Sequence, residues 1–186
     1  MSAAKIVAIV VGILLLGIVL LTLFGLTFIA VPGKGELQLV EGRTGNEEGR
    51  TIELTKGIDD LTLSLSLNPN PVAVGDNLDL TISVANTGKE SRKLSFRSSQ
   101  RYDFWAVDAK GDEIWRWSEG RMFAQVLEDI MLGSAQKREF TESWNLVDSK
   151  GTPVKAGEYR VFGAIVADDL KGQELEIDVG VEEPAQ

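Results

Sequence analysis

Near its amino terminus the chain carries an apolar segment that is too long for an ordinary buried helix. From Ile6 to Val31 no charged residue occurs in 26 positions, most of which are Ile, Val, Leu, Gly or Phe. As a helix with a rise of about 1.5 Å per residue, this segment would span about 39 Å and could cross a hydrocarbon core of about 30 Å. The sequence therefore predicts one transmembrane α-helix over residues 6–31, after a short tail of residues 1–5.

A cleaved secretory signal is the alternative, because Lys5 precedes the apolar segment. Signal peptides have an apolar region of about 7–15 residues and a small-residue cleavage site, whereas this segment is longer and ends at Phe28–Val31. We therefore expect a retained single-pass anchor in the lipid bilayer. The Lys and Arg residues on its two sides are nearly balanced, and the short lead before Lys5 favours a soluble domain outside the cytoplasm.

The chain contains no Cys and no His, which excludes several kinds of site. Ser-His-Asp triads, Cys-His pairs, thiolate or imidazole zinc sites, iron–sulfur clusters and His- or Cys-ligated haem all need these residues. Asp168 and Asp169 are adjacent carboxylates, but two neighbours whose side chains diverge do not supply the six to eight oxygens that Ca²⁺ takes. No spacing of carboxylates indicates an acid/base pair. We therefore expect no enzyme activity, no cofactor and no metal.

The net charge of −9 arises beyond residue 57, because residues 1–57 carry as many basic as acidic groups. An acidic domain repels a phosphate backbone unless a basic face is segregated on it. We therefore expect no nucleic-acid partner. The acidic excess continues into residues 182–186, which we interpret as a solvated carboxyl-terminal tail.

Residues 32–57 have the composition of a flexible linker, with six Gly residues among mixed charges. A short strand around Arg50–Leu54 could dock on the domain that follows.

Beyond Ile58 the period of the apolar residues becomes two, which is typical of half-buried strands. Alternation predicts strands at Leu61–Leu67 and Leu78–Val84, separated by a turn at Asn68–Pro71. Further strands are expected near Leu94–Phe96, Tyr102–Val107, Glu113–Trp117, Lys137–Trp144, Tyr159–Val166 and Glu174–Val181, and Phe123–Met131 is either helical or an irregular strand.

Strands without long helices between them predict an all-β domain, an immunoglobulin-like antiparallel β-sandwich over residues 58–181. Tyr159 follows a turn and begins a strand, as the tyrosine of a tyrosine corner does. Its hydroxyl would then bond to nearby backbone. A simple core tyrosine is the alternative, and either role is structural.

Two groups of residues are candidates for partner binding. Trp115 and Trp117 share one face of their strand, so they either fill the core or form an exposed aromatic patch. The segment that follows is polar and turn-like, and a rigid scaffold could present it as a protease-facing loop. Its candidate contact residues are Ser118, Glu119, Gly120, Arg121 and Met122. The alternative gives Gly120 a turn role and Arg121 a surface ion pair.

Three stretches of this chain resemble the BsuPI-type intracellular proteinase inhibitor domain. They are Phe96–Phe104 (FRSSQRYDF), Trp115–Phe123 (WRWSEGRMF), and Pro153 with Gly157–Val161 (GEYRV). The resemblance covers about residues 61–166, and the WxWSxGxxF run is its most specific part. It implies an immunoglobulin-like β domain that binds and inhibits a serine protease. The anchor and linker are departures from the soluble cytoplasmic type.

Two functions therefore stand from the sequence. The first is a membrane-anchored, non-catalytic inhibitor that binds a serine protease through a loop. The second is a scaffolding or adhesion module of the cell envelope, with the same fold and no inhibitory activity.

Overall fold

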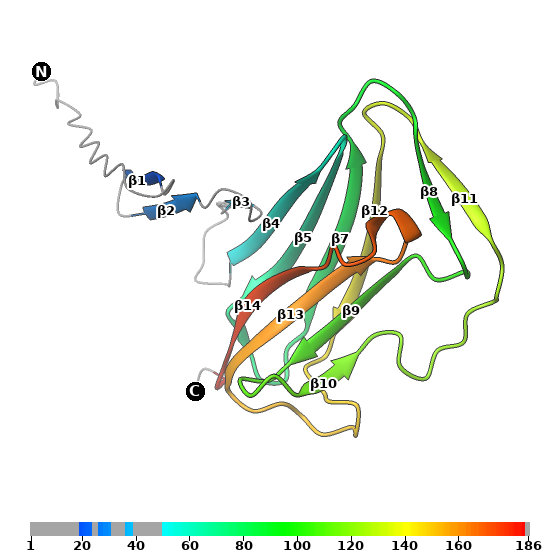
Figure 1. Cartoon of the computed structure of the whole chain (residues 1–186). Helices are drawn as coiled ribbons and strands as arrows, with labels where there is room; N and C mark the ends of the chain where they lie inside the picture. Colours follow the sequence, from blue (N-terminus) through cyan, green and yellow to red (C-terminus); the bar gives the residue numbers. More distant parts are fainter. Residues whose placement is uncertain (1–18, 24–25, 31–35, 39–49, 185–186) are drawn as a thin grey trace, which may run out of the picture.

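The computed structural model describes residues 19–23, 26–30, 36–38 and 50–184, and there the regular elements are β-strands and one 3-10 turn, η1 (Asp168–Leu170). Two sheets pack against each other as a sandwich (Figure 1). Sheet I has the order β10 (Glu113–Arg116), β9 (Tyr102–Val107), β13 (Gly157–Ile165), β14 (Leu175–Glu182) and β6 (Val72–Ala73). Sheet II has the order β12 (Lys137–Trp144), β7 (Leu78–Asn86), β5 (Leu61–Asn70), β4 (Arg50–Ile58) and β3 (Glu36–Gln38). The prediction of an all-β sandwich is confirmed.

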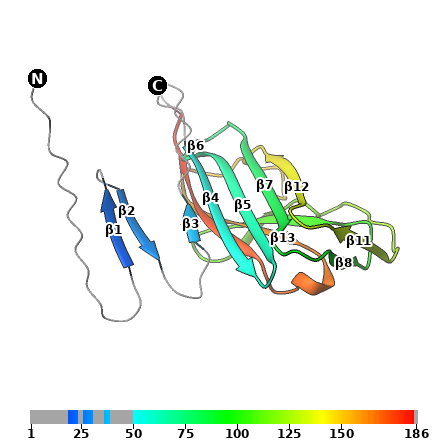
Figure 2. The same cartoon turned by 90° about the horizontal axis from the view of Figure 1, so that it is seen from above.

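A separate two-stranded sheet, which we call the arm, consists of β8 (Arg92–Phe96) and β11 (Glu128–Leu132). It stands beside the two main sheets in both views of the molecule (Figures 1 and 2). The sequence leaves Phe123–Met131 open between helix and irregular strand. The structure has a strand from Glu128 and no regular element over Phe123–Leu127.

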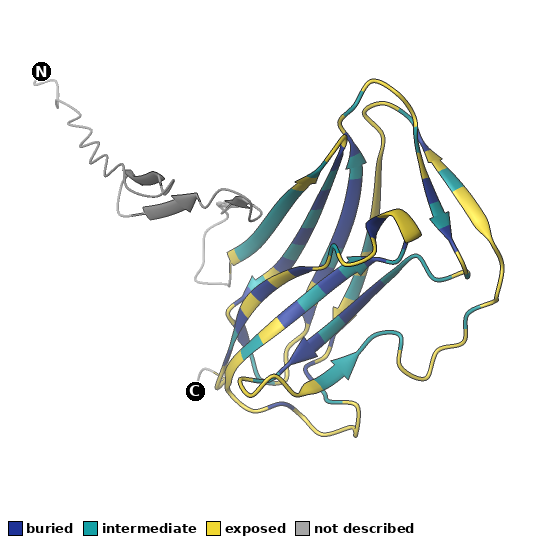
Figure 3. Ribbon diagram, viewed as in Figure 1, coloured by how far each residue is buried: buried dark blue, intermediate teal, exposed yellow. Residues whose placement is uncertain are grey.

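The core lies between the two main sheets and follows the predicted alternation. In β5 the leucines at positions 61, 63, 65 and 67 are buried, whereas the Thr and Ser residues between them are only partly buried. The same alternation runs along β14, and along β7 except at Ser83, which is buried between Ile82 and Val84 (Figure 3). Each fully buried Leu or Ile side chain stabilises the fold by about 1.5–3 kcal/mol relative to its exposed state.

The sequence predicts a turn at Asn68–Pro71, but the structure continues β5 through Asn70. The chain then enters β6, which pairs parallel with β14 of the opposite sheet. Asn70 is buried at this crossing. Its Nδ2 donates to the carbonyl oxygen of Asp178 at 2.9 Å, and its Oδ1 accepts from the N–H of Gly180 at 3.3 Å. These bonds to β14 allow a turn-forming sequence to remain in a strand.

Part of the predicted linker belongs to the sandwich. Residues 50–58 form β4, which pairs antiparallel with β5 from Arg50 to Ile58. The described residues before it, Glu36–Gln38, form β3 and pair with Glu53–Thr55 of β4. Sheet II therefore includes residues before Ile58. The short strand that the sequence allows at Arg50–Leu54 is present as part of β4. Residues 39–49 lie outside the described residues.

The predicted transmembrane helix over residues 6–31 lies mostly outside the described residues. The two segments of it that are described, β1 (Val19–Leu23) and β2 (Leu26–Ala30), are strands that pair antiparallel. At these ten positions the structure has strands where the sequence predicts a helix, and the remaining positions of the predicted helix lie outside the described residues. An apolar run does not by itself distinguish a strand from a helix, and the Val, Ile, Thr and Phe residues of these segments favour strands. Within the described ranges, no helix is both long and apolar enough to cross a membrane.

Tyr159 makes the hydrogen bond that a tyrosine corner requires. Its hydroxyl donates to the carbonyl oxygen of Lys155, four residues earlier, at 2.8 Å. The ring is partly buried and packs against the core. Both roles considered for this residue are thus combined in one side chain.

Candidate binding loop

Residues 117–127, which we call the β10–β11 loop, connect sheet I to the arm (Figure 1). The loop begins with a tight turn, in which the N–H of Arg121 donates to the carbonyl oxygen of Ser118 at 3.1 Å. Gly120 has φ +71°, a conformation that glycine adopts without strain. After this turn the chain runs without regular structure to β11.

The start of the loop is fixed by the carboxylate of Asp103 on β9. Its side chain is only 10% exposed and accepts hydrogen bonds from Ser118 Oγ (2.8 Å), the Ser118 N–H (3.2 Å) and Arg116 Nη1 (2.7 Å). Arg116 also donates to Glu113, and these hydrogen bonds raise its pKa above the ordinary value although burial lowers it. Ser118 is thus an anchoring residue of the loop, which the sequence does not indicate.

The next two candidate residues are also held. Glu119 accepts a hydrogen bond from the hydroxyl of Ser149. Arg121 folds back on the loop, because its Nε donates to the carbonyl oxygen of Trp117 at 2.8 Å and its guanidinium carbon lies 4.3 Å from the ring centroid of Trp117. The structure therefore gives Arg121 an internal contact with Trp117 in place of the projecting position that the sequence suggests.

Met122 projects from the loop and is 97% exposed. The backbone is fixed again two residues later. Ala124 accepts a hydrogen bond from the N–H of Ser99 at 2.9 Å, and its own N–H donates to Ser99 Oγ at 3.0 Å. The loop thus presents one apolar side chain between two hydrogen-bonded attachment points.

Exposed large hydrophobic residues are concentrated in one segment of the described chain. Met122 is followed by Val126, Leu127, which is 83% exposed, and Met131, which is 56% exposed. All four lie within ten residues, on the β10–β11 loop and β11. Contiguous exposed apolar surface often marks a site for binding another macromolecule, so this segment is the candidate for such a contact.

Trp115 and Trp117 are partly buried and pack against the core, as the core interpretation predicts. Trp115 stacks on the buried ring of Trp144 with a centroid distance of 5.1 Å. Trp117 lies 4.4 Å from the ring of Tyr102, and burial and a hydrogen bond to Glu142 raise the pKa of Tyr102. Trp115 therefore packs on the core, Trp117 fixes the start of the loop against Tyr102, and the two do not form a separate exposed patch.

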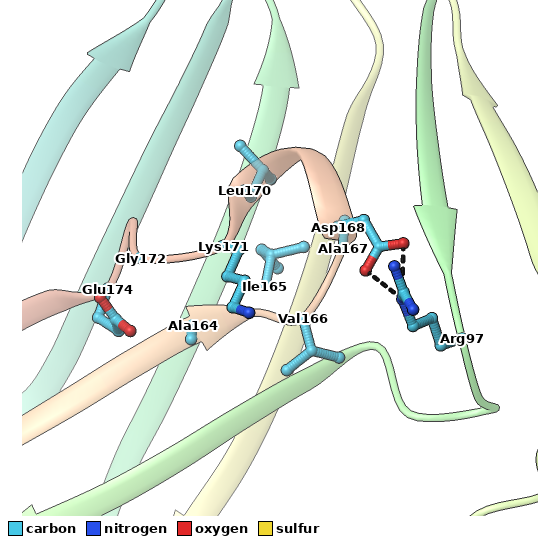
Figure 4. A pocket seen from close by; sticks show the side chains of 10 residues that line it. All are labelled: Arg97, Ala164, Ile165, Val166, Ala167, Asp168, Leu170, Lys171, Gly172 and Glu174. Atoms are coloured by element: carbon cyan, nitrogen blue, oxygen red, sulfur yellow. Dashed lines mark hydrogen bonds and ion pairs between the residues drawn. The ribbon is translucent and has the colours of Figure 1, made fainter.

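A cavity of about 570 Å³ lies beside the end of β13 and η1, on the side that faces β8 (Figure 4). At its rim Arg97 Nε donates to both carboxylate oxygens of Asp168, at 2.8 and 2.9 Å. Asp169 instead accepts the N–H of Ser95 at 3.2 Å. The adjacent carboxylates thus diverge to different partners, as expected. The described residues contain no group of three acidic side chains placed to hold a metal ion.

Residues 65–170 match the model of a protein family described as "BsuPI: Intracellular proteinase inhibitor". This range includes the β10–β11 loop and overlaps the stretches on which the resemblance rests. No curated protein matches the chain.

Several solved structures resemble the chain in part. An alkylpurine DNA glycosylase from Pseudomonas fluorescens is 14% identical over 66% of this chain and 30% of its own, with a TM-score of 0.41. A β-glucosidase from Listeria innocua is 13% identical over 70% of this chain and 17% of its own, with a TM-score of 0.37. This chain therefore spans less than a third of the length of either enzyme. The CARDB domain of a Pyrococcus furiosus protein is 19% identical over 67% of this chain and 96% of its own, with a TM-score of 0.37.

Proposed function

Because this chain belongs to the family of BsuPI intracellular proteinase inhibitors, we propose that its domain binds a serine protease and blocks it through the β10–β11 loop. The chain performs no chemistry in this role. The proposal includes an immunoglobulin-like assignment of the sandwich, which the hydrogen bond from Tyr159 to Lys155 supports. Rigid sandwiches of this kind commonly bind other proteins through the loops at their ends.

The exposure of Met122 between two attachment points is the observation that carries the proposal. A loop that is already fixed loses little conformational entropy when it binds, and this entropy is one of the main costs of association. Asp103 and Trp117 hold the loop before Met122, and Ser99 holds it afterwards. The projecting thioether side chain can then fill an apolar specificity pocket.

An inhibition assay with the full chain against a panel of serine proteases tests this proposal. Replacement of Met122 by Ala should weaken inhibition of the sensitive protease by about 30-fold or more, because a buried anchor at the centre of an interface contributes about 2 kcal/mol or more. Met131→Ala is the matched control, since it removes another exposed methionine outside the loop. Full activity of every protease in the presence of the chain would contradict the proposal.

Arg121 distinguishes two versions of the same function. Where Arg121 only supports the loop, Arg121→Lys keeps a cation near Trp117 but loses the planar contact, so inhibition should weaken by a few fold. Where Arg121 enters a specificity pocket, the inhibited protease would be one that cleaves after Arg or Lys. The kind of protease that the panel identifies separates the two versions.

We further propose that residues 6–31 attach the protein to a membrane and that the sandwich lies outside the cytoplasm. The 26 uncharged positions support this attachment. The full chain should stay with the membrane fraction in alkaline carbonate and leave it only in detergent. Release by carbonate would contradict the attachment. Digestion of the sandwich by protease added to intact cells, stripped of any outer barrier, checks the orientation.

Scaffolding or adhesion in the envelope is the second candidate function. The exposed residues Leu127, at the end of the loop, and Met131, on β11, favour it, because they add apolar surface away from Met122. This function predicts no inhibition of any protease in the panel and co-purification with a membrane-associated protein. Loss of that co-purification in Leu127→Asp, with Met122→Asp unaffected, would locate the contact near β11 and away from Met122.

A further inference from the structure

Strand β11 forms the outer edge of the arm. Within the described residues it pairs with β8 alone, and its opposite edge faces away from the sandwich (Figures 1 and 2). Met131 is exposed on this strand and Leu127 is exposed just before it. An open edge of this kind is able to pair with another strand.

The hydrogen bond of Ser95 shows which backbone groups of β11 point outward. The N–H of Ser95 donates to Asp169 and therefore points away from β11. Ser95 lies opposite Asp129, and opposed residues of an antiparallel ladder direct their N–H and C=O groups either both inward or both outward. The N–H and C=O of Asp129 thus face the open edge, and so do those of Met131 two residues later.

We propose that the protein forms a homodimer in which β11 of one copy pairs antiparallel with β11 of a second copy, centred on Ile130. In this register Asp129 lies opposite Met131 of the second copy. All four outward-facing groups of Asp129 and Met131 then find partners in each copy, and the two arms become one four-stranded sheet.

The charges of β11 are compatible with this register and disfavour the neighbouring one centred on Asp129. Asp129 faces the uncharged Met131 of the second copy, and Glu128 faces its Leu132. Pairing Ile130 with Glu128 instead would place the two Asp129 carboxylates opposite each other, which is destabilising. Each acidic residue also has a cation in its own copy, because Glu128 pairs with Arg101 and Asp129 pairs with Lys93. The edge therefore carries little net charge to repel a second copy.

A matched pair of substitutions at Met131 tests the dimer. Met131→Glu places a carboxylate opposite Asp129 of the second copy, at both symmetric positions, and should raise the dissociation constant at least about tenfold. Met131→Lys places an ammonium group there and should leave the dissociation constant at or below that of the wild type. The measurement is light scattering or sedimentation of the full chain in mild detergent over a concentration series.

Within one copy the two substitutions have the reverse effect: Met131→Glu should stabilise the arm and Met131→Lys should destabilise it. Damage to the arm therefore cannot produce the dissociation expected of Met131→Glu. Met131 faces Lys93 across the arm, and an acidic residue there attracts Lys93 whereas a basic one repels it. A monomeric wild type would overturn the proposal. Association that both variants abolish, or that neither changes, would also overturn it.

Crosslinking provides an independent measurement, because the chain contains no native cysteine. In the proposed register Ile130 faces its own counterpart, with about 4.5 Å between Cα atoms. Oxidation should therefore convert Ile130→Cys to a covalent dimer. Met131→Cys should not crosslink, because its two copies are about 8 Å apart along and across the strands. Equal crosslinking of both variants would refute the register.

Discussion

Among single residues, Asp103 has the largest set of contacts that fix the candidate loop. It is the buried member of a group that also contains Arg116 and Ser118, and the three belong to β9, β10 and the loop. A nearly buried carboxylate that accepts four hydrogen bonds stabilises the fold only while those donors remain. The position of Met122 therefore depends on a residue that does not contact the partner.

Replacement of Asp103 by Asn should lower the free energy of unfolding by about 1–3 kcal/mol, because Arg116 and Ser118 would lose a charged acceptor. Glu113→Gln is the control, since Glu113 contacts the same arginine from a more exposed position and should cost less than about 1 kcal/mol. Urea unfolding followed by tryptophan fluorescence measures both. An equal loss of unfolding free energy in the two variants would show that the buried contacts of Asp103 contribute no more to stability than the exposed contact of Glu113.

The sequence indicated the loop but not how it is held. The turn at Gly120 and the projection of a side chain near it follow from local residue types. The contact between Asp103 and Ser118 joins residues 15 apart in the chain, so no local pattern reveals it. Arg121 was expected to face a protease from a loop fixed on a rigid scaffold, or to form a surface ion pair, whereas in the structure it contacts the ring of Trp117.

At the scale of the element, strand β4 sets the boundary of the domain. Its residues are partly buried along most of its length and do not alternate between buried and exposed. The period-two signal that identifies β5 and β7 is therefore missing, and the Gly and charged residues around β4 have linker composition. β4 nevertheless covers the edge of β5, and Ile52, Leu54 and Ile58 pack against the core.

A fragment of residues 50–186 should consequently unfold cooperatively, whereas a fragment of residues 58–186 should be less stable by several kcal/mol. The shorter fragment loses the packing of Ile52 and Leu54 and exposes the edge of β5. Denaturation of the two fragments, followed by circular dichroism in urea, measures the difference. Equal midpoints would place the boundary at Ile58, where the sequence pattern places it.

At the scale of the whole molecule, the two main sheets are joined by the passage from β5 to β6. Asn70 ends a strand of sheet II and bonds to the backbone of β14 in sheet I, 108 and 110 positions later in the chain. Alternating leucines predict that two sheets face each other. They do not predict which residue connects them, because a buried amide in an Asn-Pro-Asn-Pro sequence has the local signature of a turn.

Replacement of Asn70 by Ala should lower the free energy of unfolding by about 1–3 kcal/mol, since the Gly180 N–H and the Asp178 carbonyl would lose buried partners. Asn68→Ala is the matched control two residues earlier, where the side chain is exposed and bonds only to Thr51. It should cost about 0.5 kcal/mol or less. Thermal unfolding of both variants gives the comparison, and a control as destabilised as Asn70→Ala would argue against a sheet-joining role.

Under the proposed membrane attachment, the pairing of β3 with β4 would limit the distance between the sandwich and the bilayer. Only residues 31–35 separate β2 from β3, and six peptide steps at about 3.4 Å each reach no more than about 20 Å. With residues 6–31 in lipid, strand β3 at the edge of sheet II would lie within about 20 Å of the membrane surface. Soluble macromolecules would then reach the domain from the side that faces away from the membrane. Proteins in the same bilayer would contact it at a nearly constant distance from the membrane surface.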